Sequence, residues 1–153
     1  MTSDVIVRAA AVSDFDEWLR LWDGYNEFYG RVGDARLPQV LTEMTWARFF
    51  DENEPMYALV AEVDGAVIGM AHYLFHRSTT SFAPICYLQD LFTSPDARRN
   101  GVGTRLIGAV LRKAKEAGSL RLYWQTHEDN ETARRLYDKI GERSGFLIYR
   151  AFA

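Results

Sequence analysis

The chain has 153 residues, with 18 basic and 21 acidic side chains, a net charge of −3 and 48% hydrophobic residues. This length favours one domain over residues 1–153, and the composition is ordinary for a globular protein. Because acidic side chains outnumber basic ones, the charge balance gives no general attraction to nucleic-acid phosphates or anionic membranes.

Cys86 is the single cysteine, so an intrachain disulfide is excluded. Residues 1–5 carry neither the basic region nor the apolar stretch of a signal peptide. No apolar run approaches the roughly 20 residues that cross a bilayer. We therefore expect a cytoplasmic protein without membrane or nucleic-acid partners.

The first third of the chain predicts a short strand followed by two helices, because apolar residues recur at helical spacing after a polar N-cap residue. In chain order the expected elements are a strand over 5–7, a helix from Ser13 or Asp14 to Tyr29, a loop over 30–38 and a helix over 39–50.

The middle of the chain predicts three strands. Asp64-Gly65 is typical of a tight hairpin turn, and it separates strands over 56–63 and 66–75. A third strand is expected over 85–93, before the break at Ser94-Pro95.

Helices and strands alternate in the last third. The expected elements are a helix over 101–117 ended by Gly118, a strand over 120–125, a helix from Asp129 or Asn130 to Ile140, and a final strand over 145–152. A crossover through the 101–117 helix makes its flanking strands parallel. The predicted fold class is therefore α/β (α+β): a mixed sheet with helices on both faces.

The segment from 91 to 104 is the strongest functional signal. A strand ends, a loop with Arg98 and Arg99 follows, and Gly101 and Gly103 open a helix. The first helical turn has unpaired N–H groups and a partial positive charge, and glycine lets a phosphate approach the backbone. The guanidinium groups add charge and paired donors. This pattern predicts a phosphate or pyrophosphate site.

Two common phosphate motifs do not match. The P-loop pattern fails because no Gly-Lys-Ser/Thr follows, and the third glycine of a Rossmann fingerprint would fall on Leu106. A dinucleotide-binding protein is thereby disfavoured, although the loop by itself permits one.

Arg98-x-x-Gly101-x-Gly103 instead resembles the acyl-CoA pyrophosphate loop of the GNAT (N-acetyltransferase) superfamily. Three further segments are similar to the same family: its splayed strand resembles Tyr87 to Thr93, the strand that parts from it resembles Leu122 to Gln125, and the helix that closes the cofactor site resembles Asn130-x-x-Ala133-x-x-Leu136-Tyr137-x-Lys139-x-Gly141. The resemblance covers about residues 5–152 and is strongest to the branch that acetylates histones, polyamines and small amines.

The resemblance implies an acetyl-CoA-dependent N-acetyltransferase in which a primary amine attacks the thioester directly. It also implies a twisted, mostly antiparallel sheet whose central parallel pair splays to hold acyl-CoA, and by analogy a homodimer. The implied cofactor-binding residues are Leu91, Phe92, Thr93, Arg98, Arg99, Asn100, Gly101, Val102, Gly103, Thr104, Asn130, Ala133 and Tyr137.

The implied catalytic residues are Tyr137 and Asp90. Tyr137 matches the family's general acid, which protonates the departing thiolate. Relatives in the polyamine branch carry Glu where this chain has Gln89, which cannot accept a proton at neutral pH. Asp90 is the next candidate base, although strand alternation turns it to the opposite face unless a bulge intervenes. Glu27, Tyr25 or a water chain are alternatives, and a missing base would favour an acyl-CoA sensor without turnover.

The first helix is expected to border the amine site while burying most of its aromatic rings. Asp23 and Glu27 lie one helical turn apart and are suited to attract a cationic amine. The implied substrate-binding residues are Trp22, Asp23, Tyr25, Glu27, Tyr29 and Gln89. His72 and His76 can share a strand face, but no third ligand accompanies them, so we expect no metal.

Overall fold

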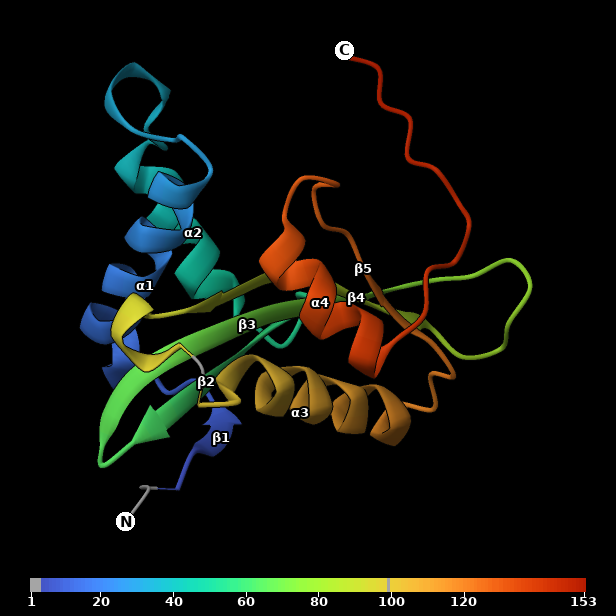
Figure 1. Cartoon of the computed structure of the whole chain (residues 1–153), viewed down its shortest axis with the longest axis horizontal. Helices are drawn as coiled ribbons and strands as arrows, with labels where there is room; N and C mark the ends of the chain where they lie inside the picture. Colours follow the sequence, from blue (N-terminus) through green and yellow to red (C-terminus); the bar gives the residue numbers. More distant parts are fainter. Residues whose placement is uncertain (1–3, 99) are drawn as a thin grey trace.

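The computed structural model describes residues 4–98 and 100–153. Its helices and strands follow the expected order from the first strand to α4 (Figure 1). They are β1 (Ile6–Ala9), α1 (Phe15–Phe28), α2 (Gln39–Arg48), β2 (Met56–Val63), β3 (Ala66–His76), β4 (Ile85–Thr93), α3 (Val102–Glu116), β5 (Leu122–Trp124) and α4 (Glu131–Ile140). None of the helices in the described part of the chain is long and apolar enough to cross a membrane.

The strands form one sheet in the order β1-β2-β3-β4-β5. The pairs from β1 to β4 are antiparallel, whereas β4 and β5 are parallel, as the crossover through α3 requires. Asp64 and Gly65 both have positive φ angles, 50° and 81°, which is the backbone of the tight hairpin that the sequence predicts. The predicted mixed sheet is confirmed.

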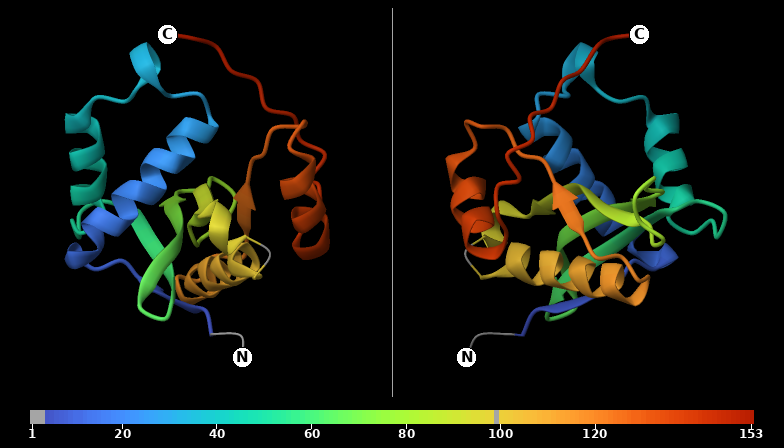
Figure 2. Two further views of the ribbon diagram at one scale, coloured as in Figure 1. Left: turned by 60° about the vertical axis from the view of Figure 1, so that its left-hand side comes forward. Right: turned by 90° about the vertical axis from the view of Figure 1, so that its right-hand side faces the viewer.

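Each face of the sheet is covered by a pair of helices (Figure 2). On one face, the aromatic side of α1 and Trp46 of α2 pack on Val60 and Met70. On the other face, Leu106 and Val110 of α3 pack on alternate residues of the same strands, and α4 lies beside α3. Strand alternation thus divides the apolar residues into two cores, with the sheet between them.

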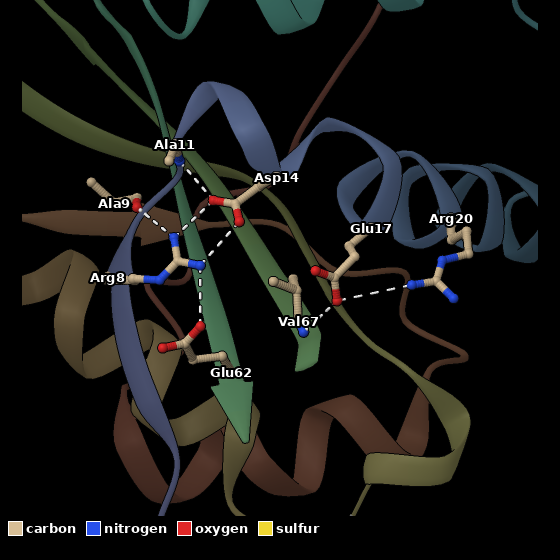
Figure 3. Close-up of polar contacts among 8 residues, drawn as sticks. All are labelled: Arg8, Ala9, Ala11, Asp14, Glu17, Arg20, Glu62 and Val67. Carbon is tan, nitrogen blue, oxygen red and sulfur yellow. Dashed lines mark hydrogen bonds and ion pairs between the residues drawn. The ribbon is translucent and has the colours of Figure 1, made fainter. Parts of the chain in front are cut away.

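A buried carboxylate joins β1 to the start of α1 (Figure 3). Arg8 donates to Asp14 at 2.7 Å and to Glu62 at 3.1 Å, and the Ala11 N–H donates to Asp14 at 2.7 Å. Asp14 stands at the expected N-cap position, but its side chain accepts hydrogen bonds from Arg8 and Ala11 and none from the first turn of the helix. The hydrogen bond from Arg8 lowers the pKa of Asp14.

The predicted strand over 145–152 is wrong. Residues 142–153 form no helix or strand and are exposed throughout. This segment runs away from the body of the protein (Figures 1 and 2). Its alternating aromatic and branched residues favour a strand, but a strand also needs a neighbour for its N–H and C=O groups, and no described part of the same chain pairs with it.

Candidate active site

The two parallel strands separate beside the middle of β4. They pair only from Cys86 opposite Leu122 to Leu88 opposite Trp124, where β5 ends. β4 continues to Thr93, and within the described residues no strand pairs with 89–93 on that side. The N–H and C=O groups along this stretch are therefore accessible to an extended ligand that pairs like a strand. This stretch contains the predicted Leu91, Phe92 and Thr93.

A β-bulge at Gln89 decides which way Asp90 points. His72 pairs with Asp90, but the next residue, Tyr73, pairs with Leu88, so Gln89 is the extra residue. Leu88 belongs to the core under α3. Asp90 would share that face without the bulge; with it, Asp90 lies on the face covered by α1. The bulge that the sequence analysis required for Asp90 to change faces is therefore present. Gln89 itself is exposed.

Asp90 belongs to a buried hydrogen-bond chain. The Trp18 indole N–H donates to His72 Nε2 at 2.9 Å, and His72 Nδ1 lies 2.9 Å from Asp90 Oδ2. Because an indole can only donate, Nε2 is the acceptor and the ring proton sits on Nδ1. His72 therefore donates to Asp90 and fixes that carboxylate, whose side chain is 11% exposed.

Tyrosine hydroxyls surround this carboxylate. Burial, and then the charge of Asp90, raise the pKa of Tyr25, so its hydroxyl stays protonated beside Asp90. Burial and then Tyr123 and Asp90 raise the pKa of Tyr87. Burial and then the nearby Tyr29 raise the pKa of Tyr137 on α4. The Tyr137 ring packs edge-on against Trp124 at 5.5 Å between centroids. The Tyr137 hydroxyl therefore stays protonated at neutral pH, and its ring lies on the last residue of β5.

The start of α3 has the geometry of an anion site. Gly101 precedes the helix with φ 72°, a left-handed conformation that suits glycine, and it has no side chain with which to cap the helix. The first-turn N–H groups, including those of Val102, Gly103 and Thr104, precede the intrahelical ladder. A Cβ on Gly103 would approach Leu136 of α4 to 3.3 Å, so this glycine lets the two helices come close.

The residues before α3 have different surroundings. Arg98 lies over the Phe92 ring, 5.7 Å from its centroid, and its Nε donates to the Thr93 carbonyl at 3.4 Å. Its guanidinium thus packs back on β4. Asn100 is exposed in the bend before the helix. Arg99, also predicted to bind cofactor, lies outside the described residues.

The start of α4 confirms the predicted cap. The Asn130 side-chain oxygen accepts from the Ala133 N–H at 3.2 Å. This bond uses the acceptor of Asn130 and the backbone donor of Ala133, so only the amide NH₂ of Asn130 remains to contact a ligand. Both residues were predicted to bind cofactor, and their observed bond is structural.

The predicted amine-binding residues fall into two groups. Trp22 and Tyr25 are buried and stacked on each other, and the Trp22 indole N–H finds no acceptor among the described residues. That donor remains for a bound molecule or water. Asp23 and Glu27 lie on another side of α1, where both line a cavity of about 310 Å³ between α1 and α2. Glu27 also borders a groove of about 630 Å³ that reaches Phe92 and Arg98.

Three residues that contact the predicted site residues were not indicated by the sequence. Trp18 and His72 were expected to be structural, because the contact between His72 and Asp90 depends on the bulge. Arg31 was not considered, yet its guanidinium carbon lies 5.4 Å from the Tyr29 ring centroid and 5.9 Å from that of Tyr25. Its position in a loop gave no periodic signal.

The surroundings of Cys86 and His76 fit a structural role for both residues. Cys86 is fully buried and burial raises its pKa to about 11, so the thiol stays protonated at neutral pH. His76 is exposed and lies 2.9 Å from the Tyr123 hydroxyl. Among the described residues, no group of three His, Cys, Asp or Glu side chains is arranged to hold a metal ion.

A mixed sheet with a splayed parallel pair, beside a glycine-opened helix, defines an acyl-CoA-dependent transferase fold. The acetyltransferase (GNAT) family model matches residues 17–141, so this chain belongs to the GNAT acetyltransferase family. It is an acetyltransferase, and acetyl-CoA is the acyl donor of this family.

Named relatives cover nearly the whole chain. The D-amino-acid N-acetyltransferase HPA3 of Saccharomyces cerevisiae is 32% identical over 95% of this chain and 89% of its own length. The uncharacterized N-acetyltransferase YhfO of Bacillus subtilis is 34% identical, with 94% of each chain covered. The thialysine N-epsilon-acetyltransferase of Bos taurus is 30% identical over 95% of this chain and 91% of its own.

Solved structures share the fold at low sequence identity. A transcriptional regulator from Bacillus halodurans C-125 matches with a TM-score of 0.83 at 19% identity, covering 98% of this chain and 100% of its own. The aminoglycoside enzyme AAC(6')-Iy, in complex with a bisubstrate analog, matches with a TM-score of 0.83 at 18% identity, covering 99% of both chains.

Proposed function

We propose that this chain transfers an acetyl group from acetyl-CoA to the primary amine of a free amino acid or a similar small molecule. One observation carries the proposal: the bulge at Gln89 turns the Asp90 carboxylate to the α1 face beside the unpaired stretch of β4, while the protonated Tyr137 packs on Trp124, where β5 ends. Amine acylation requires a group that accepts a proton from the amine and a group that donates one to the thiolate, and these two residues are suited to those roles.

The described residues fit acetyl-CoA. Backbone N–H groups at the start of α3 would hold its diphosphate, and the free edge of β4 at Leu91 and Thr93 would pair with its amides. Gly101 leaves the approach to these N–H groups free of a Cβ. When bound, acetyl-CoA supplies the acetyl thioester, an acyl carbon joined to a thiolate leaving group.

In the proposed mechanism Asp90, held by His72, accepts a proton from the substrate ammonium and frees the nitrogen lone pair. A backbone N–H near Leu91 or Phe92 polarises the acetyl carbonyl. The C–N bond forms, the C–S bond breaks, and Tyr137 gives its proton to sulfur. The nitrogen then loses its second proton to solvent, solvent reprotonates Tyr137, and Asp90 releases its proton to solvent, so that the whole cycle releases one proton.

Arg31 favours an acceptor that carries a carboxylate. Its guanidinium lies over Tyr25 and Tyr29, and these rings border Asp90 and Tyr137. Arg31 Nη1 donates a hydrogen bond to Asn26 Oδ1 at 3.0 Å. A guanidinium has five donors in a fork that matches a carboxylate. Two relatives, which are N-acetyltransferases of D-amino acids and of thialysine, support the same class of acceptor.

We further propose that residues 1–153 act as one domain, in the cytoplasm and as a homodimer, without a nucleic-acid partner. The net charge of −3 supports the last point.

The test is release of free thiol from acetyl-CoA over a panel of D- and L-amino acids, thialysine, polyamines, aminoglycosides and basic peptides. We expect amino acids to be the best substrates. Arg31→Gln should raise KM for an amino acid about tenfold or more, while KM for its decarboxylated amine stays within about twofold. Arg48→Gln, on α2, is the matched control.

Two outcomes would contradict the proposal. Acetyl-CoA binding without thiol release for any amine would indicate a sensor, the alternative that Gln89 left open. A preference for polyamines or peptides, unaffected by Arg31→Gln, would retain the transferase and reject the amino-acid acceptor.

A further inference from the structure

His72 is enclosed by aromatic rings on the α1 face of the sheet. The residue is 2% exposed. The rings of Trp18 and Trp22 on α1, and of Phe49 after α2, lie 5.9, 5.3 and 4.6 Å from the imidazole between centroids. Because bulk water is kept away from this ring, its protonation depends on its hydrogen-bond partners and on nearby charges.

A carboxylate faces this buried ring. Asp90 Oδ2 lies 2.9 Å from His72 Nδ1, and this is the one ion pair of His72 among the described residues. On the other side, the register of β2 places Ala58 opposite His72. Tyr25 of α1 is the titratable side chain that faces the same carboxylate. A carboxylate so close favours a second proton on an imidazole, because opposite charges stabilise each other.

A second proton on His72 would make Asp90 a weaker base. The imidazolium would neutralise the carboxylate in a buried site, and a neutralised carboxylate attracts the proton of a substrate ammonium less strongly. A neutral imidazole instead holds the carboxylate through one N–H and leaves its charge in place. Proton transfer to Asp90 is therefore favoured when His72 stays neutral.

Trp18 supplies the contact that opposes the second proton. Its indole N–H donates to His72 Nε2 at 2.9 Å, and Nε2 is the nitrogen that the second proton would occupy. Protonation there would set two N–H groups against each other and remove the acceptor of the indole. Trp18 is fully buried, so water cannot replace that acceptor.

The Trp18 ring is itself held in place. It stacks on Trp22 at 5.7 Å with an interplanar angle of 11°, and the Trp46 ring of α2 lies 4.7 Å away. An indole packed between neighbouring rings cannot turn away from Nε2 without disturbing the core. The donor is therefore aimed at Nε2 before any substrate binds.

We infer that Trp18 is a positioning residue that keeps His72 neutral, with its proton on Nδ1, so that Asp90 is held by a hydrogen bond and keeps its negative charge. The inference rests on the proposed function, because Asp90 is there the acceptor of the substrate's proton. Trp18 donates to His72 and His72 donates to Asp90, and no proton is transferred along this chain.

¹⁵N NMR of the imidazole rings tests the protonation of His72 without turnover. In the parent protein we expect a proton on Nδ1 and none on Nε2 between pH 8 and pH 6, with the exposed His127 as internal reference. In Trp18→Phe the smaller ring lacks the donor and admits water, so more than about half of His72 should be doubly protonated at pH 6. Trp46→Phe removes a ring from the same cluster but no hydrogen bond to His72, so this matched control should leave His72 neutral.

Thiol release from acetyl-CoA shows whether His72 acts on Asp90. Trp18→Phe should lower kcat/KM about tenfold at pH 6.5 and less than about threefold at pH 8.5, because the loss follows the second proton on His72. His72→Asn has an amide that can donate to Asp90 but gains no proton. In that background the same Trp18→Phe change should alter kcat/KM less than about twofold at either pH. Urea denaturation checks that each variant is folded.

A doubly protonated His72 in the parent protein at pH 7 would overturn the inference, and this measurement needs no variant. A His72 that stays neutral in Trp18→Phe would overturn it as well. A loss of kcat/KM that is the same at both pH values and in the His72→Asn background would assign Trp18 a structural role only. If the NMR signals change as expected but kcat/KM does not, Asp90 is not the base; the proposed mechanism then fails, while the protonation of His72 remains as inferred.

Discussion

At the scale of single residues, one extra residue in β4 determines on which face of the sheet Asp90 lies. Strand alternation alone would place Asp90 with Leu88 under α3. The bulge at Gln89 turns it toward α1, in register with His72. Gln89 stands where the family resemblance leads us to expect a glutamate. The bulge at this same residue turns Asp90 toward α1.

Asp90→Asn should lower kcat about 100-fold or more, because the amide cannot accept a proton yet keeps the size of the carboxylate. The measurement is thiol release at saturating acetyl-CoA. Asp51→Asn, after α2, is the matched control and should change kcat less than twofold. A kcat for Asp90→Asn within threefold of the parent would reassign the base to water or another group.

Tyr137→Phe tests the proposed acid. The raised pKa of Tyr137 keeps its proton available at neutral pH, so losing the hydroxyl should lower kcat about 100-fold. The dissociation constant for CoA, measured by isothermal titration, should change less than about threefold. Tyr57→Phe, on β2 and away from the cleft, is the control. If the two variants have equal kcat, another group protonates the thiolate.

At the scale of elements, α3 approaches the sheet closely because β3 has a glycine beneath it. A Cβ on Gly69 would lie 2.9 Å from Val102 and 3.2 Å from Leu106. These contacts fix the start of α3, and with it the position of its first-turn N–H groups. The position of the anion site therefore depends on the packing of a helix against a strand far away in the sequence.

Gly69→Val should destabilise the fold by about 1–3 kcal/mol, because the new side chain overpacks the core under α3. Gly108→Ala, in the same helix, is the contrasting change. Its Cβ would meet only Arg112, at 3.8 Å, so it should stabilise by about 0.5–1 kcal/mol through helix propensity. Urea denaturation measures both, and equal effects would show that α3 can shift away from β3.

At the scale of the whole molecule, a charge network joins β1, β2 and the start of α1, and it contributes to the free energy of unfolding. Asp14 is buried and accepts from Arg8 and Ala11, and these contacts lower its pKa. A carboxyl whose pKa is lower in the folded than in the unfolded protein contributes stability above its unfolded pKa, near ~3.9, and that stability is lost as pH falls through the folded value.

Asp14→Asn should therefore destabilise the protein by about 1–3 kcal/mol at pH 7, and by less as the pH falls below about 4. Urea denaturation at pH 7, 5 and 3.5 measures the difference from the parent. Asp34→Asn, at an exposed position, should show no such trend. A penalty for Asp14→Asn that is constant with pH would mean that the contribution is not electrostatic.

The sequence by itself determined the features that depend on neighbouring residues. Apolar spacing gave α1 and α3, Asp64-Gly65 gave the hairpin, and Asn130 gave the cap of α4. It also determined the family, because the Arg98 loop and the Asn130 helix carry motifs at fixed local spacing.

Only the tertiary structure decided what depends on pairing between distant segments. The bulge at Gln89 depends on the register between two strands. From the sequence alone, Asp90 could therefore be named as a candidate base only on the condition that such a bulge is present. The contact of His72 with Asp90 follows from that register. Residues 145–152 have the composition of a strand, but no segment among residues 4–98 and 100–153 pairs with them, and a strand forms only where another backbone supplies its hydrogen bonds.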